Sequence, residues 1–291
     1  MPNIKIAGVL RAGAYSPNHI GNDAAIFHAA ADELRKRGCE VTVYSEEQFN
    51  NSDIPEDVIL AMCRERDSIH KLQTLEEEGR LVINSGFGIE NCIREPMTRI
   101  LLGAGIPYPD SIIVNTNENL REALEKADIE QCWIKRGDFH AMHKEDVSFC
   151  RHPEEAQEVL HEFFYRGIPR AVINRHQPGD LIKFYGILGQ PFFYHFYPFD
   201  SHHSKYGDEA VNGHSKGLAY DEHKLRDLCN RAAEVMNVRI YGGDCIVDPD
   251  GSIRIIDFND WPSFAPCRRE AAPYIAKCVL SAVRERRRAR K

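Results

Sequence analysis

Short apolar runs alternate with longer amphipathic ones in the first third of the chain, and this order constrains the fold more than any other feature. The apolar runs have strand length and read IKIAGVL (4–10), CEVTVYS (39–45), DVILAMC (57–63) and RLVINS (80–85). Asn22 is the expected N-cap of the first helical run between them, and Gly38 its expected stop. Strands that alternate with helices form a parallel sheet covered by helices. We therefore predict a Rossmann-like α/β domain over residues 1–88, whose first long connection, with Gly13 and Pro17, lines a ligand crevice.

The pattern changes after Gly88, where strands follow one another more closely. The runs IKFYGIL and PFFYHFY flank a short Gly-Gln turn and indicate an antiparallel hairpin. A closing hairpin, RIYGGDCIVDPDGSIRIIDFND, is turned at Pro249, Asp250 and Gly251. Helices are expected over 94–102, 117–128, 154–164 and 222–236. We predict a second domain of mixed α+β type over residues 89–291, with the boundary near 86–92.

Composition excludes several classes of function. A formal net charge of −7 argues against nucleic-acid binding, which is usually accompanied by a basic surplus. The basic cluster at Arg284–Lys291 is interpreted as a helix end that complements its own dipole. No apolar run is long enough to span a bilayer, and the first residues lack a signal-peptide pattern. The 9 scattered cysteines form no CxxC pair, which is typical of reduced thiols, so we expect a cytoplasmic protein.

Acidic and amide side chains gather where the closing hairpin ends. Alternation along the last strand places Asp257 and Asn259 on one face and Ile256 and Phe258 on the other, which we predict to be the core face. The hairpin returns Asp244 opposite Ile256 or Asp257. A single acid at a strand end is usually a cap, but several oxygen donors on one edge repel one another unless a cation lies between them. We therefore predict a Mg²⁺ site, or a Mn²⁺ site, formed by Asp244, Asp257 and Asn259.

Two lysines are candidates for phosphate binding. Lys135 ends the strand CWIK, directly before a polar loop with the pattern of a lid. Lys183 lies on a strand and faces away from Ile182 and Phe184, so it needs an anionic partner.

The loop over 137–146 contains a single glycine, Gly137, and therefore cannot hold a phosphate through backbone amides alone. We predict that His140 or His143 donates to a phosphate or to the substrate, and that the loop becomes ordered when nucleotide binds. A solvated surface turn is the alternative.

In this order, the motifs resemble the ATP-grasp superfamily, in particular glutathione-synthetase-like and ribosomal-protein glutamate ligase-like carboxylate–amine ligases. The resemblance implies two lobes that grip ATP, a first lobe with the lid over 89–175 and a second lobe with the metal site over 176–291. The ATP-binding residues that it implies are Arg94 of IREPMTRILLGAGIPYP, Lys135, the adenine-linker residues Asn174, Arg175 and His176, the ribose-binding Asp180, and Lys183. Three features depart from the family pattern: Arg94 stands where Lys is commoner, Asp257 stands where Glu is commoner, and the lid is poor in glycine.

The resemblance leaves two main reaction classes open. In a ligase, ATP phosphorylates a small carboxylate and an amine or thiol displaces the phosphate, with Lys205 or Lys216 as candidate donors to the tetrahedral adduct. A kinase of the inositol-phosphate type is the alternative, because LIKFYGILG, Asp257-x-Asn259, and Lys135 with the two lid histidines resemble that branch of the superfamily. A polyphosphate substrate would demand a denser cluster of cations than this acidic chain has. A nucleotide sensor is a third class. We expect ATP and Mg²⁺ as cofactors and small-molecule partners, with a homodimer as one option.

Overall fold

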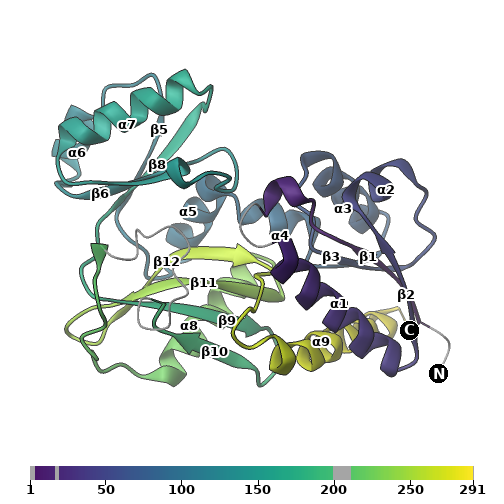
Figure 1. The fold of residues 1–291 in the computed structure, drawn as a ribbon. Coiled ribbons are helices and arrows are strands. Elements are labelled where there is room, and N and C mark those ends of the chain that lie inside the picture. Colours follow the sequence, from purple (N-terminus) through teal and green to yellow (C-terminus); the bar gives the residue numbers. More distant parts are fainter. Residues whose placement is uncertain (1–3, 17–19, 199–210, 291) are drawn as a thin grey trace.

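The computed structural model describes residues 4–16, 20–198 and 211–290. Within these ranges the strands form three four-stranded sheets, each built from one stretch of the sequence (Figure 1). One sheet is parallel and two are antiparallel, which confirms the predicted Rossmann-like domain followed by two α+β lobes. No helix of the described ranges is long and apolar enough to cross a membrane.

The parallel sheet has the strand order β2-β1-β3-β4, and helices cover its two faces. Gly38 follows the first long helix with φ of 82°, where glycine is favoured, so the predicted stop is confirmed. The predicted Asn22 cap is wrong, because the helix already includes Ile20 and Asn22 accepts instead from the guanidinium of Arg268 at 2.8 Å. The elements are β1 (Ile4–Val9), η1 (Gly13–Tyr15), α1 (Ile20–Lys36), β2 (Cys39–Tyr44), α2 (Glu46–Asn51), β3 (Val58–Ala61), α3 (Arg66–Glu77), β4 (Leu81–Ile83) and α4 (Gly86–Asn91).

The first antiparallel sheet, in the order β5-β8-β6-β7, forms a separate lobe with its own core. Helices α6 and α7 pack on one face of it, and α6 is shorter than the predicted 117–128. The elements are α5 (Arg94–Gly103), β5 (Ser111–Asn115), α6 (Arg121–Lys126), β6 (Cys132–Arg136), η2 (Lys144–Asp146), β7 (Val147–Cys150), α7 (Pro153–Tyr165) and β8 (Arg170–Arg175).

The second antiparallel sheet, in the order β10-β9-β11-β12, buries its apolar face against α8. Its elements are β9 (Asp180–Ile187), β10 (Phe193–Phe196), α8 (Glu222–Val235), β11 (Ile240–Val247) and β12 (Ile253–Asp260). The last helix, α9 (Arg268–Ala289), returns along α1 of the N-terminal domain and shares its core (Figure 1).

A β-bulge in the closing hairpin changes one prediction. Asp244 lies opposite Asp257 as expected, but Cys245 lies opposite Ile255, so Ile256 is an extra residue without a partner. The core face of β12 therefore carries Ile255 and Phe258, both fully buried, and the prediction that Ile256 belongs to the core is wrong. The alternation fails because the bulge inserts one residue, and Ile256 lines the pocket described below.

Asn84 fastens the N-terminal domain to the second antiparallel sheet. Its amide nitrogen donates to the carbonyl of Ile240 at 2.7 Å. Its amide oxygen accepts from the backbone N–H groups of Arg239 and Ile240, both at 2.9 Å. The side chain is fully buried, so it satisfies backbone groups that water does not reach.

Candidate functional site

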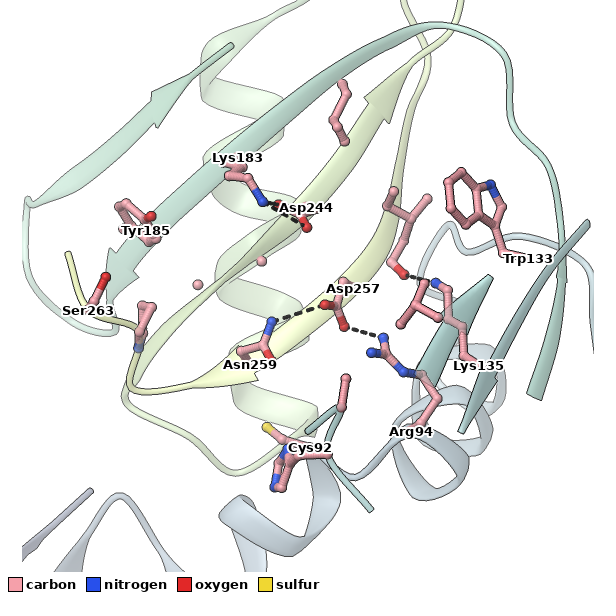
Figure 2. A pocket seen from close by; sticks show the side chains of 18 of the residues that line it. Cys92, Arg94, Trp133, Lys135, Lys183, Tyr185, Asp244, Asp257, Asn259 and Ser263 are labelled. Atoms are coloured by element: carbon pink, nitrogen blue, oxygen red, sulfur yellow. Dashed lines mark hydrogen bonds and ion pairs between the residues drawn. The ribbon is translucent and has the colours of Figure 1, made fainter. Parts of the chain in front are cut away.

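The N-terminal domain and both antiparallel sheets contribute to a pocket of about 300 Å³. Its wall includes the polar face of β9, β11 and β12, part of β6 with the loop after it, and the segments that follow β1 and β3. The pocket thus lies where the two lobes and the N-terminal domain meet, and Figure 2 shows the side chains of part of its lining.

The floor of the pocket is an ion-paired row across three hydrogen-bonded strands. Asp244 on β11 lies directly opposite Lys183 on β9 and Asp257 on β12. Nζ of Lys183 donates to Oδ1 of Asp244 at 3.1 Å and to Oδ2 at 3.4 Å. Asn259 lies on the same face and donates from Nδ2 to Oδ2 of Asp257 at 3.2 Å (Figure 2). The structure therefore brings together the predicted metal ligands and one predicted phosphate-binding lysine.

Arg94, at the first position of α5, pairs with the second acid of this row. Its Nη1 donates to Oδ1 of Asp257, and its side chain is only 9% exposed. Burial alone would raise the pKa of Asp257, but the charges of Arg94 and Lys135 outweigh it and hold the pKa at about 2. Asp257 is therefore a carboxylate at every physiological pH.

Lys135 approaches the same row from the other lobe. Its Nζ donates to the carbonyl oxygen of Ile256, the bulged residue, at 3.0 Å. Burial and the nearby charge of Arg94 lower the pKa of Lys135 from 10.5 to about 7. The ammonium thus lies in the pocket without a carboxylate in direct contact among the described residues, and an anionic ligand would stabilise its charge.

The donor set is compatible with a hard divalent cation. Asp244 and Asp257 are neighbours on the pocket face, and because Asn259 uses its nitrogen toward Asp257, its oxygen is the atom that could face a metal. Oxygen donors of this kind, few in number and completed by phosphate oxygens, suit Mg²⁺. Lys183 and Arg94 compensate the two carboxylate charges, so a bound cation would have to share these oxygens or displace the side chains that pair with them.

The residues that the resemblance assigned to the nucleotide fall into two groups. Asn174 and Arg175 line the pocket, together with Trp133 on the neighbouring strand. His176 does not line it; its Nδ1 accepts from Trp133 Nε1 at 3.1 Å. Asp180 does not line it either, because its carboxylate accepts from the backbone N–H groups of residues 216 and 218, both at 2.8 Å.

One of the two candidate donors to a tetrahedral adduct is described by the structure, and it is not brought to the pocket. Lys216 is not among the residues that line it, and its backbone N–H is bound to Asp180. Lys205 lies outside the described residues.

The two lid histidines occupy different places. His140 is buried in the pocket wall, whereas His143 does not line the pocket. Asp146 organises the loop, because its Oδ2 accepts from the backbone N–H groups of Met142 at 2.8 Å and His143 at 3.0 Å. The loop over 137–146 is thus held through a side chain, as its low glycine content requires.

Phe139 connects this loop to the N-terminal domain. Its ring lies 5.7 Å from the ring of Tyr15, and the guanidinium of Arg66 lies 5.3 Å from its centroid. Arg66 also donates to the carbonyl of Asp138 at 3.1 Å. These contacts join the loop to the segments that follow β1 and β3.

A buried group of charges on the N-terminal side of the pocket was missed from the sequence. Arg11 donates to Asp23 at 3.0 Å and lies 3.4 Å from Asp260, and Arg64 donates to Asp260 at 3.0 Å. Their positions in the sequence were the available signal, because Arg11 and Arg64 follow β1 and β3 within three residues, at the edge of a parallel sheet where ligand crevices form.

Known proteins match this chain in structure but not in sequence. No protein-family model and no curated protein matches the sequence. D-alanyl-alanine synthetase A from Vibrio cholerae O1 biovar eltor has a TM-score of 0.69 at 11% identity, over 97% of this chain and 99% of that one. D-alanine–D-alanine ligase from Bacillus anthracis, solved with ATP, has a TM-score of 0.69 at 14% identity, over 98% and 99%. ATP-grasp ligase PsnB, solved with a precursor peptide and AMPPNP, has a TM-score of 0.61 at 16% identity, over 97% and 99%.

Identities this low carry the fold but not the reaction. The likeness covers nearly the whole length of each protein, so it includes the N-terminal domain as well as both lobes. It agrees with the resemblance drawn from the motifs, and the chain has the ATP-grasp fold.

Proposed function

We propose that the protein is an ATP-dependent ligase that joins a small carboxylate to an amine or a thiol through an acylphosphate. The observation that carries the proposal is the convergence, on one pocket, of Lys135 from the first lobe with Lys183, Asp244, Asp257 and Asn259 from the second. Phosphoryl transfer needs positioned cations rather than covalent help from the protein, and this pocket offers them from both sides.

Each side chain has a role that follows from its contacts. Lys135 binds a phosphate oxygen, because it is a buried cation that an anion would stabilise. Lys183 binds a second phosphate from the opposite lobe, after giving up its contact with Asp244. Arg94 holds Asp257 in place and offers a guanidinium beside it. A divalent cation bound by Asp244, Asp257 and Asn259 would neutralise phosphate charge.

The loop over 137–146 closes the pocket on the side of the N-terminal domain. His140 lies in the wall and is our candidate for a donor to phosphate or substrate. Phe139, packed against Tyr15, excludes water from the same region. Exclusion of water matters because an acylphosphate hydrolyses readily when water reaches it.

The ligase is favoured over the kinase by two observations. The structures with this fold named above are those of ligases. Among the described residues, six lysines and arginines line the pocket, but all of them except Lys135 are already paired with acids, whereas a polyphosphate acceptor would require several available cations.

Calorimetry tests whether the protein binds ATP and whether this binding requires a divalent metal. We expect binding that requires Mg²⁺ or Mn²⁺ and that weakens by on the order of 1–3 kcal/mol in Lys135→Met and in Lys183→Met, since each keeps the apolar stem and loses the charge. Equal affinity with and without metal, or wild-type affinity in both variants, would contradict the proposal.

Phosphorus NMR tests the reaction class. A ligase supplied with its acid and amine releases free phosphate, whereas a kinase moves the phosphoryl group onto the product. A product that carries the phosphoryl group would contradict the ligase proposal and support the kinase.

A further inference from the structure

The buried charges on the N-terminal side of the pocket form an alternating chain. It runs Asp23, Arg11, Asp260, Arg64, with separations of 3.0, 3.4 and 3.0 Å between the charged atoms. The exposed fractions of the side chains are 8%, 5%, 0% and 11% in that order. We call this chain the Arg11–Arg64 cluster. Its formal charge is zero, so its members can remain ionised in a buried place.

The two arginines of the cluster are used differently. Each of the three guanidinium nitrogens of Arg11 donates a hydrogen bond. Nε donates to the carbonyl of Met62 at 3.1 Å and Nη1 to Asp23, and Nη2 donates to Asp260 and to the carbonyl of Trp261. Arg64 binds Asp260 through Nη2, at 3.0 Å to Oδ1. Its Nε is buried and has no hydrogen-bond partner among the described residues.

The unsatisfied Nε of Arg64 indicates a missing ligand. Leaving such a buried donor unpaired is unfavourable, and a ligand oxygen that reached it would remove this cost. Arg64 lines the pocket, as do Arg11 and Asp23, whereas Asp260 does not and lies behind them. The cluster therefore presents to the pocket two guanidiniums, one of which retains an unpaired Nε donor, and a single carboxylate.

We propose that Arg64 binds a carboxylate of a substrate, one that does not itself react, and that Arg11 positions Arg64 by holding Asp260. The inference rests on the proposed ligase function and names the class of substrate for that site. A planar carboxylate matches the guanidinium fork, and a singly charged group is tolerated better than a phosphate dianion in a cluster of zero net charge.

Two kinds of substrate carry such a group. One is a dicarboxylic acid, of which the other carboxylate is activated at Lys135 and Lys183. The other is an amino acid that serves as the nucleophile through its amine. Both would place a carboxylate at Arg64, and the experiment below separates them.

The competing interpretation is that the Arg11–Arg64 cluster only ties β1 and β3 to the end of β12. A purely structural cluster would explain the ion pairs but not the unpaired Nε, and it predicts no response of Arg64 to ligands.

NMR of protein labelled with ¹⁵N-arginine tests the proposal directly, because the Nε–Hε signal of Arg64 is identified by its loss in Arg64→Lys. The full chain is saturated with Mg²⁺ and AMPPNP and titrated with glutarate, L-alanine and D-alanine, and with their amides glutaramide and alaninamide. We expect the signal to shift saturably with glutarate or with alanine, but not with the amides. A shift with glutarate alone would identify the substrate as a dicarboxylic acid. A shift with alanine alone would identify it as an amino acid. If no carboxylate shifts the signal, or if the amides shift it equally, the proposal is wrong.

Arg64→Lys also separates this proposal from the proposed function. The lysine keeps a positive charge for Asp260 but has no Nε–H, so affinity for the effective carboxylate should fall roughly tenfold or more while the affinity for MgATP is unchanged. Arg35→Lys, an exposed arginine in the same domain, is the matched control and should change neither. Failure of the wild-type protein to bind MgATP would contradict the proposed ligase function. Normal MgATP binding with equal carboxylate affinity in both proteins would overturn only the role of Arg64.

Discussion

Lys135 shows how burial sets the charge of a single side chain in this pocket. Its pKa in the folded protein is about 7, lowered by burial and by Arg94 from the ordinary 10.5. Since the folded pKa lies below the ordinary one, the charged form opposes folding, fully so below pH 7, and this cost disappears as the pH rises past 10.5. A bound phosphate would reverse the shift by giving the ammonium a partner.

Nucleotide binding should therefore take up a proton. At about pH 8 most free protein has neutral Lys135, and contact with phosphate restores the charge, so we expect uptake approaching one proton per ATP, and almost none at about pH 6. Calorimetry in buffers of different ionisation enthalpy measures this uptake. Lys135→Met should abolish it, and Lys183→Met, which leaves Lys135 in place, should keep it. Uptake that is independent of pH would argue against Lys135 as the group that titrates.

Two ligand candidates on β12 should differ in what they do for stability. Asp257→Asn leaves Arg94 buried without its ion pair, so in metal-free protein it should lower the free energy of unfolding by about 2–4 kcal/mol. Asn259→Ala removes one hydrogen bond to Asp257 and should lower it by about 1 kcal/mol. Both should abolish turnover. Denaturant unfolding in the presence of a chelator measures the difference, and equal losses would show that the pair with Arg94 contributes no more to stability than the hydrogen bond from Asn259.

At the scale of elements, the loop over 137–146 offers a matched pair of histidines. His140 is buried in the pocket wall and His143 does not line it. We expect His140→Ala to lower kcat/KM roughly tenfold or more, as loss of one charge-assisted hydrogen bond would, and His143→Ala to change it little. Steady-state kinetics with ATP as the varied substrate checks this. Full activity in His140→Ala would make the loop a cover without a chemical role.

Features that depend on residues close together in the sequence could be predicted, whereas features that depend on distant residues could not. The strands and most helices follow from apolar periodicity, and the opposition of Asp244 and Asp257 follows from the length of the hairpin and its turn. The bulge at Ile256 could not be predicted, because a run of apolar residues gives no sign of which one is unpaired. The Arg11–Arg64 cluster was missed for another reason: Arg11 and Asp260 are 249 positions apart, and only the tertiary fold makes them neighbours.

At the scale of the whole molecule, Asn84 joins the N-terminal domain to the lobe that holds the metal candidates. It makes three hydrogen bonds to buried backbone groups, all on β11 or directly before it. Asn84→Ala would leave these groups unsatisfied and should lower the free energy of unfolding by roughly 2–4 kcal/mol.

Asn91 provides the control for this prediction. It also bridges the domains, but through one hydrogen bond, from Nδ2 to the carbonyl of Met236 at 3.1 Å. Asn91→Ala should therefore cost about 1 kcal/mol in the same denaturant titration. Separate unfolding of the N-terminal domain in wild-type protein would show that Asn84 does not couple the two parts.

Because of the bulge at Ile256, the number of residues in β12 determines which side chains face the pocket. Deleting one residue between the turn at 249–251 and Asp257 would either remove the bulge or slide the strand by one place. Removal of the bulge would displace the carbonyl that accepts from Lys135. A slide by one place would turn Phe258 toward the pocket, and Asp257 and Asn259 toward the core. Gly243 adds to this sensitivity, because a side chain there would collide with the backbone oxygen of Asp257. The number of residues between the turn and Asp257 is therefore as strict a requirement of this pocket as the identity of the side chains that line it.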